Sequence, residues 1–138
     1  MIYFKQTKLL NYLEPRLNFN QGKVFSLSKW RKEVLARDKN KCQNCFNAII
    51  DIHRNRKSVN EAHHIIPRHH GGKNTINNGI TICTFCHDYF DLMYFRYGFD
   101  YFEVIKKKST EQRIKVVREL MEEHYTRYLL NIIVNHKD

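Results

Sequence analysis

The chain has 138 residues, a length that suits one domain with an accessory arm. Hydrophobic residues make up 42% and aromatic residues 13%, so the chain can bury a core and does not belong to the disordered class. Twenty-four Lys and Arg against fourteen Asp and Glu give a formal charge of +10, which favours a polyanionic partner such as nucleic acid. The charge alone leaves a merely basic surface open as the alternative.

No apolar run reaches the length of about 18 residues that a transmembrane helix needs, so no membrane partner is expected. The N-terminal stretch MIYFKQTKLLNYLEPRLNF lacks a clean apolar core followed by small residues and does not predict a secretory signal. We therefore expect a cytoplasmic protein. Thiols stay reduced in the cytoplasm, so the four cysteines indicate metal ligands before disulfides.

The first elements in chain order are helical. Residues 1–22 indicate a short helix or arm. Ser28 is the expected N-cap of a helix over residues 29–38, because it stands directly before a run with helical periodicity. The apolar side of this helix contains Trp30 and Val34.

After Cys45 the sequence changes to strand-like periodicity. The runs AIIDIH and VNEAHHII predict two short strands around a polar turn, and GITIC predicts a third. Pro, Gly and Asn residues indicate a loop over residues 67–79. The segment TFCHDYFDLMYFRY then predicts a helix that ends at Gly98.

The C-terminal residues predict a long helix that begins at Ser109 or Thr110. An apolar stripe at helical spacing fits core packing or an interface better than a cofactor site. Its members are Ile114, Val117, Leu120 or Met121, and Tyr128. We expect three parts: an N-terminal arm over residues 1–28, a core over 29–97, and a helical extension over 98–138 that packs on the core or forms an interface.

The four cysteines form two CxxC pairs, Cys42-Gln-Asn-Cys45 and Cys83-Thr-Phe-Cys86. A CxxC turn points both sulfurs into one concavity, and two such turns complete a tetrahedral ligand set for Zn²⁺. Binding energy of this kind is partly folding energy, which suits a chain with a modest core. We predict one structural Zn²⁺, with disulfides or a rubredoxin-like iron centre as alternatives. Four sulfur ligands leave no open position, so catalysis needs a second centre.

Between and after the cysteine pairs the sequence reads EAHHIIP, then Gly-Gly, then Asn78-Gly-Ile-Thr-Ile-Cys-Thr-Phe-Cys-His87. This order strongly resembles the His-Asn-His (HNH) endonucleases of the zinc-braced CxxC…CxxC subtype. The phrase VLARDKNKCQNC resembles the usual lead-in of that family, so the resemblance extends over about residues 29–90. Several motif elements in one order are much more specific than any one of them.

The resemblance implies an α+β fold with a small ββα-metal (His-Me finger) core, braced here by the four-cysteine zinc site and flanked by N- and C-terminal helices. Residues 29–97 would be this nuclease core. The resemblance also implies hydrolysis of phosphodiester bonds in double-stranded DNA, with 5′-phosphate and 3′-hydroxyl products. By analogy, it suits a phage or mobile-element protein in a bacterial or phage-infected host cell.

Carried over residue by residue, the resemblance implies His64 as general base and His63 and His87 as ligands of one catalytic divalent ion. Asn78 would be either a ligand or a brace for the loop. A neutral imidazole can accept a proton from the attacking water, and a divalent ion offsets charge in the transition state. The family often has Asp where this chain has His63. We therefore expect Mn²⁺, Ni²⁺ or Co²⁺ to support cleavage better than Mg²⁺.

The geometry of a strand restricts how the adjacent histidines can work together. Neighbouring side chains of a regular strand point to opposite faces, so His63 and His64 share one site only if the strand end twists. Otherwise the ion lies on one side and the phosphate bridges the gap. Asp91 lies four residues after His87 on the predicted helix and could reach the same ion.

Basic residues near the site are expected to contact DNA phosphates, and these are Arg54, Arg56, Lys57, Arg68 and Lys73. His69 and His70 are expected to lie in solvated loop. The main alternative function is a non-catalytic zinc-containing module that binds nucleic acid, and a redox protein is a weaker one. The sequence leaves open whether the protein is a monomer or a homodimer and whether it nicks DNA or cuts both strands.

Overall fold

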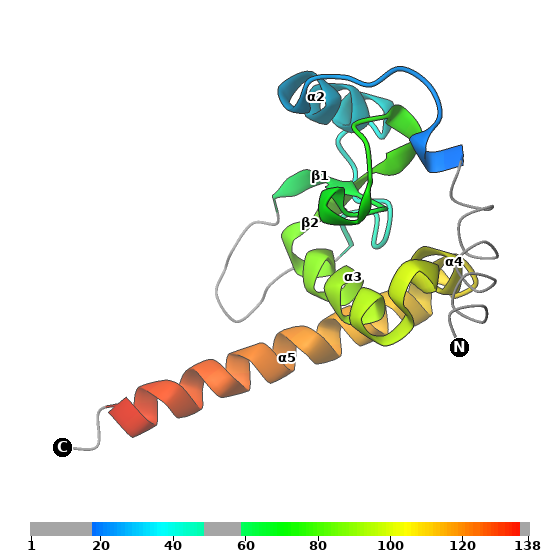
Figure 1. The fold of residues 1–138 in the computed structure, drawn as a ribbon. Helices are drawn as coiled ribbons and strands as arrows, with labels where there is room; N and C mark the ends of the chain where they lie inside the picture. The colour runs from blue at the N-terminus through cyan, green and yellow to red at the C-terminus, as the bar shows by residue number, and fades with distance from the viewer. Residues whose placement is uncertain (1–17, 49–58, 136–138) are drawn as a thin grey trace, which may run out of the picture.

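The computed structural model describes residues 18–48 and 59–135. The principal elements are α2 (Leu27–Arg37), β1 (Asn60–His64), β2 (Gly79–Cys83), α3 (Thr84–Tyr97), α4 (Tyr101–Lys106) and α5 (Thr110–Asn135), as Figure 1 shows. Short 3-10 turns cover Arg68–His70, Ile76–Asn78 and Gly98–Asp100. The protein therefore combines several helices with one small sheet, as expected for the α+β class.

The sheet is an antiparallel pair of β1 and β2, with α2 on one side and α3 on the other (Figure 1). Gly79 of β2 faces α2, and a Cβ atom at this position would collide with the side chain of Val34. A glycine is therefore needed for α2 to approach the sheet this closely. The opposite face packs on α3, whose Tyr89, Phe90 and Met93 are buried.

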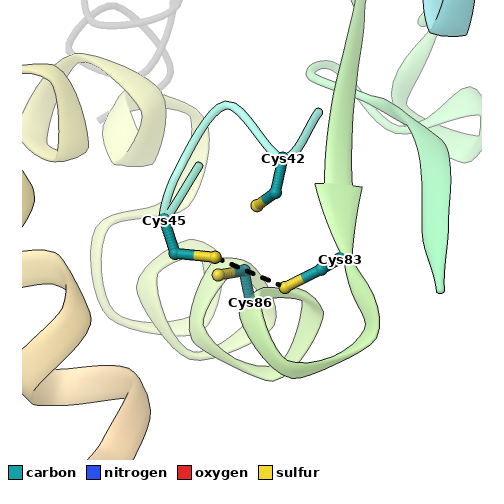
Figure 2. Close-up of side chains that lie close together, drawn as sticks. All are labelled: Cys42, Cys45, Cys83 and Cys86. Carbon is teal, nitrogen blue, oxygen red and sulfur yellow. Dashed lines mark hydrogen bonds between the residues drawn. The ribbon is translucent and has the colours of Figure 1, made fainter. Parts of the chain in front are cut away.

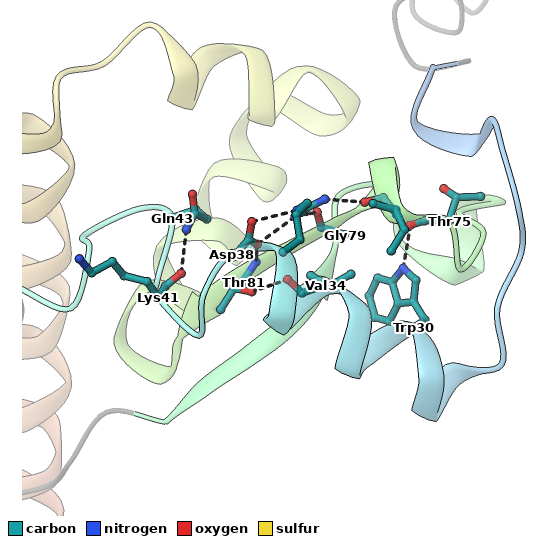
Figure 3. Close-up of polar contacts among 10 residues, drawn as sticks. Trp30, Val34, Asp38, Lys41, Gln43, Thr75, Gly79 and Thr81 are labelled. Carbon is teal, nitrogen blue, oxygen red and sulfur yellow. Dashed lines mark hydrogen bonds and ion pairs between the residues drawn. The ribbon is translucent and has the colours of Figure 1, made fainter.

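Polar contacts attach α2 to β2 and to the turn before it (Figure 3). The indole Nε1 of Trp30 donates a hydrogen bond to the carbonyl of Thr75 at 2.7 Å. At the other end of the helix, the carboxylate of Asp38 accepts one from the backbone N–H of Thr81 at 2.9 Å. Arg37 donates to the carbonyl of Gly79 at 2.6 Å. These bonds fix both ends of the helix against β2 and the turn that precedes it.

The main hydrophobic core lies between the sheet, the cysteine loop and the three C-terminal helices. Tyr101 of α4 and Val117 of α5 are buried in the same cluster as Phe90 of α3. Ile114, Leu120 and Met121 pack against the cluster from outside. The first half of α5 therefore covers the core, whereas its C-terminal half extends away from it (Figure 1).

Several predicted elements are confirmed, and the start of α2 differs. β2 and α3 coincide with the predicted strand and helix, and α3 ends before Gly98. A capping box starts α5, in which Ser109 and Gln112 exchange hydrogen bonds between side chain and backbone. The N-cap of α2 is Ser26, so the prediction of Ser28 was wrong. The helix begins two residues earlier than predicted, because the backbone N–H of Trp30 already bonds to the carbonyl of Ser26.

The region between the strands is more structured than the predicted loop. β1 ends at His64, and two 3-10 turns lie within residues 67–79. The short helix α4 lies in the predicted helical extension but was not predicted as a separate helix. Except for Ala48, the predicted strand AIIDIH lies outside the described residues. Most of the predicted arm over residues 1–28 also lies outside them, as does the side chain of Tyr128. None of the helices in the described part is long and apolar enough to cross a membrane.

Candidate functional site

The four cysteines lie together beside the start of α3 (Figure 2). All four are buried, and their Sγ atoms lie within 4.8 Å of one another. The sulfurs of Cys45 and Cys83 are 3.7 Å apart. A disulfide bond measures about 2.05 Å, whereas two sulfurs of a tetrahedral Zn²⁺ site lie about 3.8 Å apart. The cluster therefore has the spacing of a metal site, and the four cysteines could hold zinc.

The cysteine loop has a backbone suited to this task. It is anchored to the sheet because the backbone N–H of Gln43 donates to the carbonyl of Thr81 at 2.8 Å. The side chain of Asn47, whose φ is 63°, accepts a hydrogen bond from the N–H of Cys42 at 3.2 Å. Asn tolerates this left-handed conformation better than most residues. The loop can therefore fold back and present both of its sulfurs to the start of α3.

The crowded thiols need a cation to ionise together. Hydrogen bonding within the cluster, first with Cys42, raises the pKa of the Cys86 thiol far above its ordinary value. The same contacts raise the pKa of Cys45, whereas the hydrogen bond from Cys45 lowers the pKa of Cys42 to about 7. A bound Zn²⁺ would remove this conflict, because it stabilises thiolates over thiols.

His64 lies on the α2 face of the sheet. Its ring stacks on the indole of Trp30, with ring centroids 3.8 Å apart and an interplanar angle of 12°. Its Nε2 lies 2.8 Å from Oδ1 of Asn74. Burial lowers the pKa of His64, the bond to Asn74 opposes this, and the nearby charges of Arg68 and Arg31 lower the pKa further. The imidazole is therefore neutral at pH 7 and able to accept a proton.

His63 lies on the α3 face of the same strand. Its ring centroid is 5.3 Å from that of His87 and 5.6 Å from that of Phe90. Burial lowers the pKa of His63 to about 4, with a smaller contribution from the neighbouring His87. A neutral imidazole keeps the lone pair that metal binding requires.

The first turns of α3 place carboxylates beside His87. Nδ1 of His87 lies 3.1 Å from the carboxylate of Asp91, one helical turn further along. Ligand atoms of His87, Asp88 and Asp91 lie within 4.8 Å of one another. Asp88 was not among the predicted residues, although its position next to His87 in the sequence was a signal for it. It also lies 3.4 Å from Nε2 of His124 on α5.

The two adjacent histidines of β1 thus face different helices. His64 contacts Trp30 of α2, whereas His63 contacts Phe90 and His87 of α3. The strand keeps its regular alternation up to His64, which lies opposite Gly79 in the sheet. Of the two arrangements considered for the pair, the structure has the one with the histidines on opposite faces.

Asn78 is fully buried, and backbone groups occupy its amide. Its Oδ1 accepts a hydrogen bond from the N–H of Ile66 at 2.7 Å. Its Nδ2 donates to the carbonyls of Ile66 and Lys73 at 3.1 and 3.0 Å. Gly72 packs closely against Ile66 and Asn78, and a Cβ atom at this position would collide with the Ile66 carbonyl. The contacts of Asn78 are those of a brace between the end of β1 and the following loop.

The predicted DNA contacts are only partly within the described residues. Arg68 and Lys73 are exposed on the loop that follows β1. The other three, Arg54, Arg56 and Lys57, lie outside the described residues. His69 and His70 are exposed in the 3-10 turn, where the ring of His70 lies 5.1 Å from that of Phe99.

Comparison with known proteins supports the resemblance. Residues 42–89 match the family model described as HNH endonuclease. No curated protein and no solved structure matches the chain significantly. The matched segment contains both cysteine pairs, the two histidines of β1, Asn78 and His87. The helices, the two-stranded antiparallel sheet and the four clustered cysteines are consistent with a small ββα-metal core. The resemblance to the HNH endonucleases is therefore confirmed for residues 42–89 of this chain.

Proposed function

We propose that this protein is a metal-dependent endonuclease that hydrolyses phosphodiester bonds of double-stranded DNA, leaving 5′-phosphate and 3′-hydroxyl ends. The HNH match suggests a nuclease-family function. The observation that carries the proposal is the arrangement of the adjacent histidines. His64 and His63 flank the same end of β1 on opposite faces, and His87 lies beside His63. A phosphate at this strand end can therefore contact both faces.

His63 and His87 are the proposed ligands of the catalytic ion. Two imidazoles bound to one ion at about 2.1 Å would have ring centres roughly 5 Å apart, which fits the observed 5.3 Å. Asp91 adds a carboxylate 3.1 Å from His87, and we propose it as a third ligand. When bound, a divalent ion offsets charge on the scissile phosphate and on the leaving 3′ oxygen.

His64 is the proposed general base. Its neutral ring can take the proton from the water that attacks phosphorus. The charges of Arg31 and Arg68 both lower the pKa of His64, and we propose that these two side chains bind the phosphate beside it. Lys73 on the same loop, together with Arg54, Arg56 and Lys57, is proposed to hold the duplex through its phosphates.

The remaining motif residues are proposed to be structural. Asn78 holds the loop through three backbone contacts, so we propose it as the brace of this site. The four cysteines are proposed to bind one Zn²⁺ that joins the cysteine loop to the start of α3. Because His87 directly follows Cys86, the zinc also fixes the position of one proposed catalytic ligand.

A cleavage assay tests this function. Zinc-loaded protein is incubated with supercoiled plasmid in Mg²⁺, Mn²⁺, Co²⁺ or Ni²⁺, beside His64→Ala and the control His69→Ala. We expect the wild type and His69→Ala to cleave at similar rates and His64→Ala to be slower by about 10²- to 10⁴-fold. Equal cleavage by the wild type and His64→Ala would contradict the mechanism. Absence of cleavage in every ion would instead favour a non-catalytic module that binds nucleic acid.

A further inference from the structure

The proposed general base has a polar partner that the motif does not supply. Oδ1 of Asn74 lies 2.8 Å from Nε2 of His64. On its other side, Nδ2 of Asn74 donates to the carbonyl of Phe25 at 3.2 Å, and the N–H of Phe25 donates to the carbonyl of Asn74 at 2.9 Å. Two carbonyl oxygens repel each other, so the amide nitrogen must face Phe25. The amide oxygen is left to face His64.

This orientation decides which imidazole nitrogen carries the proton. An amide oxygen can only accept, so Nε2 of His64 must be the donor. A neutral imidazole has one N–H, and therefore Nδ1 keeps its lone pair. Within residues 18–48 and 59–135, no hydrogen bond involves Nδ1 of His64. It is the nitrogen available to a water molecule.

We propose that Asn74 is a positioning residue, which holds His64 in the Nε2-protonated tautomer so that Nδ1 takes the proton of the attacking water. The catalytic part of this inference rests on the proposed nuclease function. The step is balanced: the water oxygen forms a bond to phosphorus, its proton moves to Nδ1, and the bond from phosphorus to the 3′ oxygen breaks. The leaving oxygen then takes up a proton from solvent.

Two constraints are needed to orient a flat ring, and the structure supplies both. The stack on Trp30 sets the plane of the His64 ring, and Trp30 is itself fixed by its 2.7 Å bond to the carbonyl of Thr75. A stack alone would still let the ring flip and exchange its two nitrogens. The hydrogen bond to Asn74 prevents this flip. The stack therefore sets the plane of the ring, and the hydrogen bond sets which nitrogen faces Asn74.

Asn74 is in turn held by a strap, residues 18–25, that precedes the HNH match. The side chain of Asn20 donates to the carbonyl of Gly71 and accepts from the N–H of Lys73, both at 3.0 Å. Asn77 donates to the carbonyl of Asn18 at 3.2 Å. Together with the Phe25 contacts, these bonds attach the loop that carries Asn74 along the strap.

The tautomer of His64 is the direct test. Imidazole ¹⁵N chemical shifts are measured by NMR on the zinc-loaded full chain, well above the pH at which the ring titrates, and the His64 signals are identified by their loss in His64→Ala. We expect the Nε2-protonated form in the wild type and a mixture of tautomers in Asn74→Leu. Asn77→Leu is the matched control, because it loses a strap contact on the same loop and should leave the tautomer unchanged. An Nδ1-protonated wild type, or the same tautomer in Asn74→Leu, would overturn the proposal.

Cleavage kinetics test the catalytic consequence. Asn74→Leu should lower kcat by about 10- to 100-fold and leave KM for DNA within about twofold, because the base is misoriented and the DNA contacts remain. Asn74→Asp keeps the acceptor oxygen for His64 but loses the donor to the Phe25 carbonyl, so it should recover part of the rate. If Asn74→Asp is folded yet no faster than Asn74→Leu, the positioning role is wrong. The tautomer measurement requires no cleavage, so a failure of the nuclease function stays distinguishable from a failure of this inference.

Discussion

Two groups of potential metal ligands lie next to each other along α3, and they are built in opposite ways. Cys86 belongs to a set of four sulfurs that are almost completely inaccessible to solvent. The next residue, His87, and Asp91 have side chains that are 41% and 60% exposed. The sulfur set can fill every position of a tetrahedral ion, whereas the second group leaves room for water and phosphate. The contrast separates the site that we propose to stabilise the fold from the one that we propose to be catalytic.

The adjacency of the two groups has a further consequence. The first turn of α3 links them rigidly, since Cys86 and His87 are consecutive. A substitution at one of the four cysteines should therefore disturb both sites. A substitution at His87 should disturb only the proposed catalytic site. Replacement of Cys86 tests that asymmetry directly, and smaller effects are expected at Asn78 and in the choice of catalytic ion.

Removal of one sulfur should have the largest effect. Cys86→Ser should lose the zinc and the cooperative fold, because structural Zn²⁺ contributes apparent free energies of about 10 kcal/mol or more in small zinc domains. Zinc content and thermal unfolding followed by circular dichroism measure this. The matched control is His87→Ala, which should keep both. A Cys86→Ser variant that melts cooperatively at the wild-type temperature would show that the sulfur set is not structural.

Loss of the Asn78 amide should destabilise the protein less severely. Asn78→Ala removes three hydrogen bonds and leaves buried backbone groups unpaired, so we expect a loss of about 2–4 kcal/mol in the free energy of unfolding. Urea unfolding of the zinc-loaded protein measures it. The exposed Asn77→Ala should cost less than about 1 kcal/mol. Unchanged stability together with weaker binding of the catalytic ion would assign Asn78 as a ligand instead.

The smallest expected effect is the difference in cleavage rate between catalytic ions. Imidazole ligands favour Mn²⁺, Co²⁺ or Ni²⁺, so we expect wild-type cleavage with the best of these to exceed that with Mg²⁺ by roughly fivefold. His63→Asp should reduce this ratio, because a carboxylate suits Mg²⁺. Initial rates of plasmid nicking at saturating ion concentration give the ratio. A wild type that prefers Mg²⁺ would mean that His63 does not set the metal preference.

Local patterns predicted the parts of the molecule that local interactions determine. The strand GITIC, the helix that ends at Gly98 and the two CxxC pairs each have a signal within a few residues, and the structure has them where expected. The N-cap at Ser26 was missed by two residues, because both positions are serine and the side chain of Ser26 makes no capping hydrogen bond. Helix α4 is short and has no clear periodicity of its own, so burial of Tyr101 and Ile105 determines it.

The contacts that complete the site depend on residues far apart in the sequence. Trp30 was predicted only as part of the apolar side of its helix, and nothing in the neighbouring sequence indicates that its indole stacks on His64. Asn74 had the appearance of an ordinary turn residue, because asparagine is common in such loops. The alternatives for Asn78, ligand or brace, differed only in where the amide points. Those features require the packing of α2, the strap and the loop against one another.

The central claim is that His63 binds the catalytic ion and His64 accepts the proton. Mn²⁺ binding tests this claim most directly. Mn²⁺ prefers nitrogen and oxygen ligands, so it should leave zinc in the sulfur site. Isothermal titration of zinc-loaded wild type, His63→Ala and His64→Ala with Mn²⁺ measures the affinity of the second site. We predict that His63→Ala weakens Mn²⁺ binding by about tenfold or more, whereas His64→Ala binds as the wild type does. Equal weakening in both variants, or weakening only in His64→Ala, would contradict the assignment of one histidine to the ion and the other to the proton.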